Sequence, residues 1–384
     1  MIWEKLKLDE LCTIKGRIGY RGYTKADLVE KGNGAITLSP TNIISNKLSF
    51  NKNSYISWEK YYESPEIMLE IGDIVFCKTA SIGKLAFVEK LPEKTTINPQ
   101  FVVLKNITCN AKFLHYYMQS TFFKAQLSKI IGGTAIPTVS QKNFGNLIIF
   151  IPPLAEQESI VAKLDAAFAK IDEAINAATA KETEVQMLKA SMLSSSFNGD
   201  AVMWTNKPLG EVCEILDKLR KPITKIDRKS GVIPYYGATG VVDRVDDFIF
   251  NEKLVLVGED GAKWKRGDKT AFIINGKAWV NNHAHVLRPY DGVLIHEWLE
   301  YYLTSIDLSP WVHGATVPKL NQTQLRSIPI PIPPLEEQER IVARLDEAFS
   351  EFKNVNEAIV KSKANYLVLK SAILAQELQS SEAA

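Results

Sequence analysis

The chain carries a cluster of basic residues that could bind an anionic surface such as a phosphate backbone. The segment 217–229 holds six Lys or Arg against two Asp, and three more basic residues follow at Lys263, Lys265 and Arg266. Lys and Arg donate charge-assisted hydrogen bonds to phosphate oxygens, so the cluster is compatible with nucleic-acid binding. A charge run of this kind is equally compatible with an ordinary solvated face.

Two further motifs have a chemical interpretation and a plainer structural one. The tetrapeptide NPQF at 98–101 differs from the catalytic tetrapeptide of amino-methyltransferases by its Gln, and no FxGxG cofactor loop lies nearby. This favours a turn at the start of a strand. The segment YGATG at 236–240 lacks the lysine and the following helix of a Walker loop, which favours a glycine turn. Tyr235 and Tyr236 could still stack, or contact a backbone, at the edge of that turn.

The remaining candidates for catalysis or metal binding are few. His283 and His285 would share one face of a strand, but no third metal ligand is in view. The chain also shows no nuclease-like acidic cluster. We therefore predict no catalytic residue, no metal site and no cofactor of its own.

The strongest signal is an internal repeat. Residues 151–168 (IPPLAEQESIVAKLDAAF) and 332–349 (IPPLEEQERIVARLDEAF) are identical at 14 of 18 positions, at an offset of 181. The same offset pairs Pro137 with Pro318 and Gln141 with Gln322. A weaker match at offset 201 begins each half, so the second copy has lost about twenty residues in its middle. Two similar folds with divergent interiors are predicted.

A long helix is predicted after each copy. Each repeated block begins with two prolines and several Glu, which favour and stabilise a helix start. Residues 154–197 would form a rod of about 66 Å. Apolar residues recur there at the alternating spacing typical of a coiled coil, namely Val161, Leu164, Phe168, Ile171 and Ile175, and later Val342, Leu345, Phe349, Phe352 and Ile359. An antiparallel pair is the preferred interpretation; the alternative is two separate helices, each lying on its own domain.

The divergent segments are predicted to be mixed α/β modules. Apolar runs around glycine-containing turns predict a β-hairpin over 72–89 and a similar pattern over 253–280. Helical spacing predicts one helix per module, over 112–129 and over 295–306.

Composition averages over these unlike parts. The chain has 384 residues, a net charge of +2 and 46% hydrophobic residues, which allows two or three domains and excludes general disorder. The segment 154–197 has four Lys against seven Asp or Glu, and so offsets the basic regions. A charged start, short apolar runs and four scattered cysteines without a CxxC predict a cytoplasmic protein with reduced thiols and no membrane span.

The repeated blocks resemble the helical regions of type I restriction–modification specificity subunits. PYYGATG (234–240), VLVGEDGA (255–262) and VNNHAHVL (280–287) also resemble stretches of one class of their target recognition domains. The resemblance covers nearly the whole chain, in the order of the family. It implies recognition domain 1 at 1–150, a spacer helix at 151–200, recognition domain 2 at 201–331 and a C-terminal helix at 332–384, with a pseudo-twofold internal repeat.

The resemblance implies a non-catalytic DNA reader. Each domain would read one half of an asymmetric bipartite site, while the helices set the spacing and dock two methyltransferase subunits. Restriction subunits would join, and S-adenosylmethionine, ATP and Mg²⁺ would belong only to those partners. The alternatives are a specificity subunit that serves a methyltransferase without a nuclease partner, a self-contained methyltransferase, and a scaffold protein.

Basic and aromatic residues of both modules are the candidates for contact with double-stranded DNA, since such side chains set register and affinity at the phosphates. In the first module they are Arg17, Tyr20, Arg21, Lys78 and Lys84. In the second module they are Lys218, Arg220, Lys221, Tyr235, Tyr236, Lys263, Lys265 and Arg266.

Overall fold

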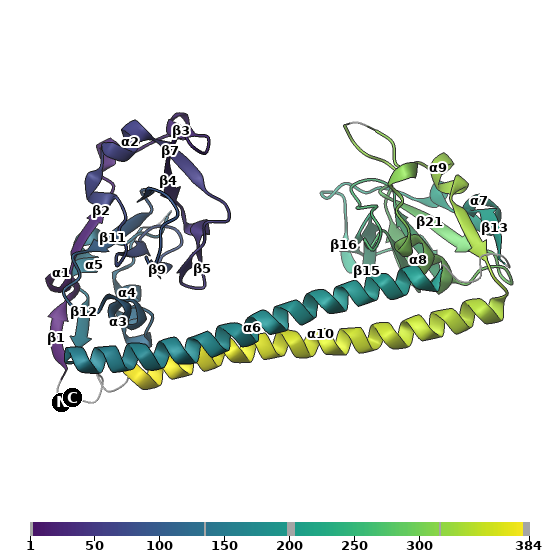
Figure 1. The fold of residues 1–384 in the computed structure, drawn as a ribbon. Coiled ribbons are helices and arrows are strands. Elements are labelled where there is room, and N and C mark those ends of the chain that lie inside the picture. The colour runs from purple at the N-terminus through teal and green to yellow at the C-terminus, as the bar shows by residue number, and fades with distance from the viewer. Residues whose placement is uncertain (1–2, 134–135, 198–203, 315, 379–384) are drawn as a thin grey trace. The chain divides into compact units, whose positions relative to one another are not determined.

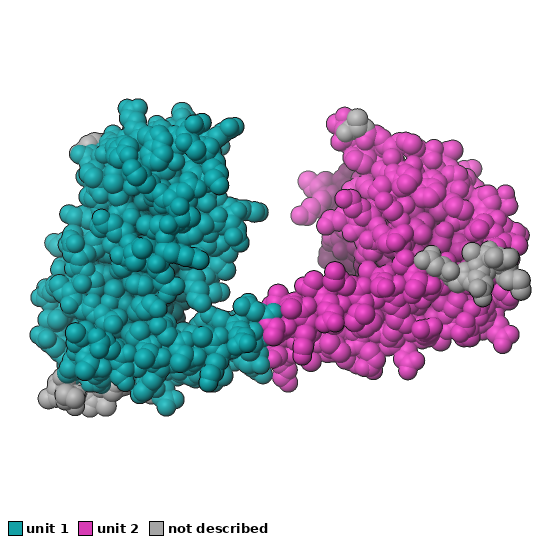
Figure 2. Space-filling view, viewed as in Figure 1, with its two compact units in different colours: residues 1–176, 363–384 teal, residues 177–362 magenta. Residues whose placement is uncertain are grey.

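The computed structural model describes residues 3–133, 136–197, 204–314 and 316–378, which form two compact units (Figures 1 and 2). Unit 1 comprises residues 1–176 and 363–384, and unit 2 comprises residues 177–362. Each unit therefore holds one mixed α/β module, the first part of one long helix and the last part of the other. The domain boundary predicted at 200/201 lies outside the described residues.

Unit 1 is built on two four-stranded sheets. The first has the order β2 (Thr13–Gly16), β11 (Phe101–Lys105), β8 (Ile74–Cys77), β9 (Leu85–Phe87), and all its pairs are antiparallel. The second has the order β10 (Thr95–Ile97), β4 (Gly34–Leu38), β7 (Ser54–Ser57), β3 (Leu28–Val29). Two short pairs complete the unit: β1 (Glu4–Lys7) with β12 (Ile148–Ile151), and β5 (Ile43–Ile44) with β6 (Lys47–Leu48).

The first sheet is buried on both faces, which explains the unbroken apolar run of β8. Ile74 and Phe76 point into a core with the helices, whereas Val75 and Cys77 point into a core with the second sheet. Successive side chains of a strand alternate between faces, so a strand covered on both sides must be apolar throughout.

Short helices cover the first face of this sheet: α1 (Leu8–Leu11), α3 (Ala111–Tyr117), α4 (Thr121–Ile130) and α5 (Gln141–Gly145). A fifth helix, α2 (Trp58–Tyr62), follows β7. The single helix predicted over 112–129 is wrong. The chain leaves α3 after Tyr117, and the Ser120 hydroxyl accepts a hydrogen bond from the Phe123 amide to cap a new helix, α4.

Unit 2 repeats the order of the first sheet, with fewer residues between β14 and β18 than between β2 and β8. One sheet runs β14 (Cys213–Ile215), β21 (Ala284–Pro289), β18 (Leu254–Gly258), β19 (Ala271–Ile274). The other runs β16 (Gly240–Val245), β15 (Ser230–Gly237), β20 (Lys277–Val280), β17 (Phe250–Asn251). The remaining elements are β13 (Thr205–Pro208), which pairs with β22 (Pro329–Ile332), and the helices α7 (Leu209–Val212), α8 (His296–Ser305) and α9 (Gln322–Ser327).

The predicted hairpin is confirmed in the first module and only in part in the second. β8 and β9 form the antiparallel pair expected over 72–89. In the segment 253–280, β18 pairs with β19, but β20 leaves that hairpin and pairs with β15 and β17 in the other sheet. The helix predicted over 295–306 is confirmed as α8.

The long helices are α6 (Leu154–Ser196) and α10 (Leu335–Leu378). In unit 1, the start of α6 packs with the end of α10, and the Lys370 ammonium lies 4.6 Å from the Phe168 ring centroid and 2.9 Å from an Asp172 oxygen. In unit 2, the end of α6 packs with the start of α10, and the Lys189 ammonium lies 4.8 Å from the Phe349 ring centroid. The same Lys–Phe contact thus occurs once in each unit.

The apolar seam of α6 serves its module as well as α10. Val161, Leu164, Phe168 and Ile171 belong to the core that includes α3 and α4, and Leu374 and Leu378 of α10 join that core. The predicted alternative, in which each helix lies on its own domain, therefore describes part of the packing. No described helix carries an apolar stretch sufficient to cross a lipid bilayer.

A buried glutamine fastens each long helix to its module. Gln338 donates to the Pro333 and Val293 carbonyls and accepts from the Ile295 amide. Gln157, at the equivalent position, donates to the Pro152 carbonyl and accepts from the Asn110 amide. Gln338 is 0% and Gln157 4% exposed, so every one of these bonds replaces water.

We expect Gln338→Leu to destabilise the chain by about 2–3 kcal/mol, because three backbone groups, of Pro333, Val293 and Ile295, would lose this partner. Thermal unfolding of the full chain measures the loss. Glu339→Ala is the matched control, since Glu339 is the next residue of α10 and is exposed. Equal melting temperatures for the two variants would contradict the anchoring role of Gln338.

Candidate nucleic-acid interface

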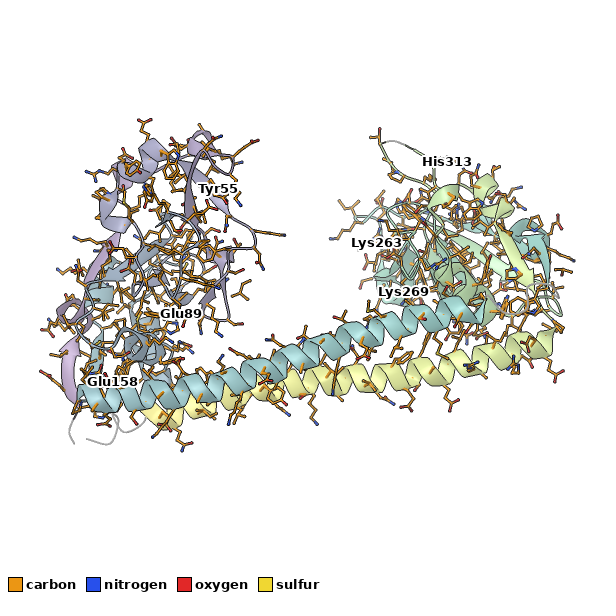
Figure 3. All side chains as sticks on the ribbon, viewed as in Figure 1. Tyr55, Glu89, Glu158, Lys263, Lys269 and His313 are labelled. Atoms are coloured by element: carbon orange, nitrogen blue, oxygen red, sulfur yellow. The ribbon has the colours of Figure 1, made fainter. Side chains whose placement is uncertain are left out.

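Four loops of unit 2 meet at one end of the β14–β21–β18–β19 sheet. They follow β14 and β18 and precede β21 and α9, and antiparallel pairing brings their ends together: Gly258 at the end of β18 lies opposite Ala284 at the start of β21. The basic residues predicted from two distant segments, 217–229 and 263–266, therefore reach the same edge. Figure 3 marks Lys263 and His313 on two of these loops.

A buried network holds the four loops together. Glu259, 7% exposed, accepts a hydrogen bond from Arg220 and forms an ion pair with Lys319 at 2.9 Å. Asp217 accepts from the Val286 amide at 3.0 Å and contacts His285 Nδ1 at 2.6 Å. Burial works to raise the pKa of Asp217, but the hydrogen bonds of His285 and Val286 outweigh it and hold that pKa below its ordinary value.

Asp217, Glu259 and His285 have the composition of a metal site, and their ligand atoms lie within 4.8 Å of one another. Protein atoms already use these ligands, however. His285 contacts Asp217 through Nδ1 and the Leu320 carbonyl through Nε2, at 2.6 and 2.7 Å. His283 is directed to a different partner, Asp260. The arrangement fits a structural ion-pair network better than a metal site.

The predicted basic residues of unit 2 occupy two kinds of position. Lys218, Lys221, Lys263, Lys265 and Arg266 are exposed on the loops. The Arg220 side chain is only 12% exposed, because its guanidinium binds Asp217, Glu259 and the carbonyl of Ala284. Arg220 therefore has a structural task in the network, and contact of any of these residues with DNA stays a prediction.

The two tyrosines are internal parts of the β15–β16 hairpin. Tyr235 is 1% exposed, and its hydroxyl accepts from the Ile223 amide at 3.0 Å. The Arg228 guanidinium lies 4.3 Å from the Tyr235 ring centroid and 2.9 Å from Asp243. Tyr236 is half-buried against Phe272. The expected glycine turn at 236–240 is present, since Gly237 pairs with Gly240 at the tip of the hairpin.

Unit 1 gathers its loops at the corresponding sheet end, after β2 and β8 and before β11. Lys84 is exposed and donates to the Pro40 carbonyl, and Lys78 is half-buried. Arg21 lies 3.5 Å from Glu66. The side chain of Tyr20 lies outside what the structure describes. The NPQF segment forms the predicted turn into β11, where the Asn98 side chain accepts from the Gln100 amide.

Arg17 is the least accessible of the predicted residues in unit 1, with 6% exposure. It donates to the Ile97 and Arg21 carbonyls and lies 5.3 Å from the Tyr23 ring centroid. Burial lowers the pKa of the Arg17 guanidinium. These contacts make Arg17 a link between loops, and any role in DNA binding stays a prediction.

Sequence reasoning missed Lys319, Glu259 and Asp217, which complete the network. Lys319 stands alone in a neutral segment and gave no charge signal. The equivalent residues of unit 1 also meet: Lys78, which directly follows β8 as Glu259 follows β18, has its carbonyl 3.4 Å from the hydroxyl of Thr138. All four cysteines are free, and burial raises the pKa of Cys12 and Cys213 to about 12.

The comparisons with known proteins define the class. The model of the family described as "Type I restriction modification DNA specificity domain" matches residues 2–180 and again 201–362. The chain therefore belongs to this family, and the two matches show its internal repeat.

Individual relatives agree with this assignment. The chain is 38% identical over 156 residues to the type I restriction enzyme specificity subunit S.HindORF215P of Haemophilus influenzae, covering 41% of this chain and 40% of that relative. It thus spans about two fifths of that protein. It is 24% identical over 366 residues to the MjaX specificity subunit of Methanocaldococcus jannaschii, covering 85% and 84%.

Solved structures share the fold. A chain from a structure of the type I R-M system, solved to explain complex assembly and conformational transition, matches with a TM-score of 0.74 at 22% identity, covering 98% of this chain and 97% of that one. The HsdS subunit of Thermoanaerobacter tengcongensis matches with a TM-score of 0.53 at 22% identity, covering 99% and 97%.

The network predicts different effects for two neighbouring basic residues. Arg220→Ala should lower the free energy of unfolding by about 2–3 kcal/mol, because it leaves buried carboxylates short of a partner. Lys218→Ala should change it by less than about 0.5 kcal/mol, because Lys218 is exposed. Urea denaturation of the full chain measures both, and an equal loss would contradict the structural role of Arg220.

Proposed function

We propose that this chain is the DNA specificity subunit of a type I restriction–modification complex. Each unit reads one half of a bipartite DNA site. The observation that carries the proposal is the paired set of basic loops, one at the same sheet end of each module, in a chain of this family. The two loop sets differ in sequence, and different readers imply an asymmetric site, because identical readers on a twofold frame would select a palindrome.

The chain is non-catalytic in this proposal. Methylation of a base inside a duplex requires the base to leave the stack. The specificity subunit holds the DNA, and two methyltransferase subunits dock on the long helices and bind S-adenosylmethionine. Restriction subunits with ATP and Mg²⁺ complete the complex. The helices α6 and α10 set the number of unread base pairs between the half-sites.

The phosphate-binding role of the exposed loops can be tested by salt dependence. We expect the full chain, in complex with its methyltransferase partner, to lose affinity for duplex DNA steeply with salt, because phosphate contacts release counterions. Lys263→Gln should reduce the slope of log K against log salt by about one if Lys263 contacts a phosphate. Fluorescence anisotropy with a labelled duplex measures the slope.

Lys253→Gln is the matched control, because Lys253 lies just before β18, at the opposite end of the same sheet. It should leave the slope unchanged. Equal slopes for Lys263→Gln and the wild type would show that Lys263 does not contact a phosphate. Absence of any salt-dependent DNA binding by the complex, or methylation by the purified chain alone, would contradict the proposed function.

The spacing role of α6 predicts a change of target. Insertion of four residues after Ala180 lengthens the helix by about 6 Å and keeps the following side chains within about 40° of their original face. At about 3.4 Å per base pair, the unread gap should grow by one or two pairs. Sequencing of methylated sites measures the gap. Ala180→Ser is the length-neutral control, and an unchanged gap in the insertion variant would contradict the spacing role.

A further inference from the structure

One short loop is built in the same way in both units, and we call it the apex loop. Its described residues are 132–133 and 136–138 in unit 1 and 313–314 and 316–319 in unit 2, at the offset of 181. Its ends exchange two backbone hydrogen bonds: 2.9 and 2.8 Å between Gly132 and Thr138, and 3.0 and 2.8 Å between His313 and Lys319.

Each apex loop is fixed to the basic end of its sheet. The Val139 amide donates to the Lys78 carbonyl at 2.9 Å, and the Leu320 amide donates to the Glu259 carbonyl at 2.8 Å. Lys78 directly follows β8, and Glu259 directly follows β18. In unit 2 the Lys319 ammonium adds an ion pair with Glu259. The apex loops therefore belong to the candidate nucleic-acid interface of each unit.

A glycine in each apex loop makes its conformation possible. Gly133 has φ +96° and Gly314 has φ +113°, the left-handed region that other residues rarely adopt. A Cβ at Gly133 would lie 2.4 Å from the Ile136 carbonyl oxygen, and a Cβ at Gly314 would lie 2.4 Å from the Val317 carbonyl oxygen. Both loops thus pack the backbone of an apolar residue against a glycine.

That apolar residue is held in solvent in both units. Ile136 is 60% exposed and Val317 is 63% exposed. A single exposed apolar side chain needs no explanation. Here, however, the two modules differ in most of their other loops and still keep an exposed apolar residue at the same position of the apex loop. In both units this residue lies on the same hydrogen-bonded frame, beside the basic end of the sheet. Such a position fits a contact that both modules make irrespective of the bases that they read.

We propose that Ile136 and Val317 are DNA wedges, one for each half-site. Apolar side chains that enter a duplex separate neighbouring base pairs and bend the DNA. Loosening one base step would also ease the extrusion of a nearby base, which the partner enzyme requires. The inference rests on the proposed function and adds to it a role for two named residues that carry no charge. A contact with a partner protein is the competing outcome of the test.

The experiment uses the full chain in complex with its methyltransferase partner and a duplex that contains the methylated target. A 2-aminopurine placed at successive positions reports base unstacking by its fluorescence. We expect Ile136→Ser to lower affinity for this duplex about tenfold, the loss of one buried apolar side chain, and to remove the fluorescence rise at one step of one half-site. Val317→Ser should do the same in the other half-site.

The salt slope should stay unchanged in both variants, because neither removes a charge. Ile71→Ser is the matched control, since Ile71 is 72% exposed and precedes β8, at the opposite end of the sheet. Wild-type affinity and fluorescence in Ile136→Ser and Val317→Ser would overturn the proposal. So would weaker assembly with the methyltransferase subunit at unchanged DNA affinity, which would assign the apex loops to a protein contact. If the wild-type complex itself binds no DNA, the proposed function fails instead.

Discussion

The sharing of the two long helices between the units is the constraint on which the rest of the structure depends. Each unit contains the first part of one helix and the last part of the other. The first part is fastened to its module by a buried glutamine, Gln157 or Gln338, and the last part packs against it through a Lys–Phe contact. Neither unit is therefore complete without chain from both halves of the sequence.

This arrangement explains why the repeated blocks are nearly identical while the modules differ. Leu164 shares a core with its own module and with Leu374 of α10, and Leu345 shares a core with its own module and with Leu193 of α6. Both leucines are 0% exposed, at equivalent positions. The loops at the basic sheet ends do not have to fit a second helix in this way. Their sequences can differ between the modules, as long as the ion pairs beneath them are kept, as in the Arg220–Glu259 network of unit 2.

The sequence predicted the parts of the fold that depend on local pattern. Helix starts at Pro pairs, the seam spacing and the β8–β9 hairpin all follow from residues close together in the chain. The break after Tyr117 was missed because the Ser120 cap is a single hydrogen bond within an apolar helical pattern. The transfer of β20 to the other sheet was missed because it depends on pairing with β15, some forty residues away.

The sequence predicted basic residues of the candidate interface, but not which of them are exposed and which are held by internal partners. Charge counting found the exposed Lys218, Lys221 and Lys263, but it could not show that Arg220 turns inward to Glu259. That ion pair joins segments 39 residues apart, and only the folded sheet brings them together. Burial also gives Arg17 and Tyr235 internal partners, a distinction that residue type does not carry.

The most direct test of the central claim, that two unlike readers share one chain, is the methylation pattern it directs. The chain is expressed with its methyltransferase partner in a host that lacks other adenine methylation, and methylated adenines are mapped by sequencing. We predict one bipartite target with two different half-sites separated by a fixed gap. A continuous target, a palindrome of two identical half-sites, or a gap that varies between sites would contradict the account.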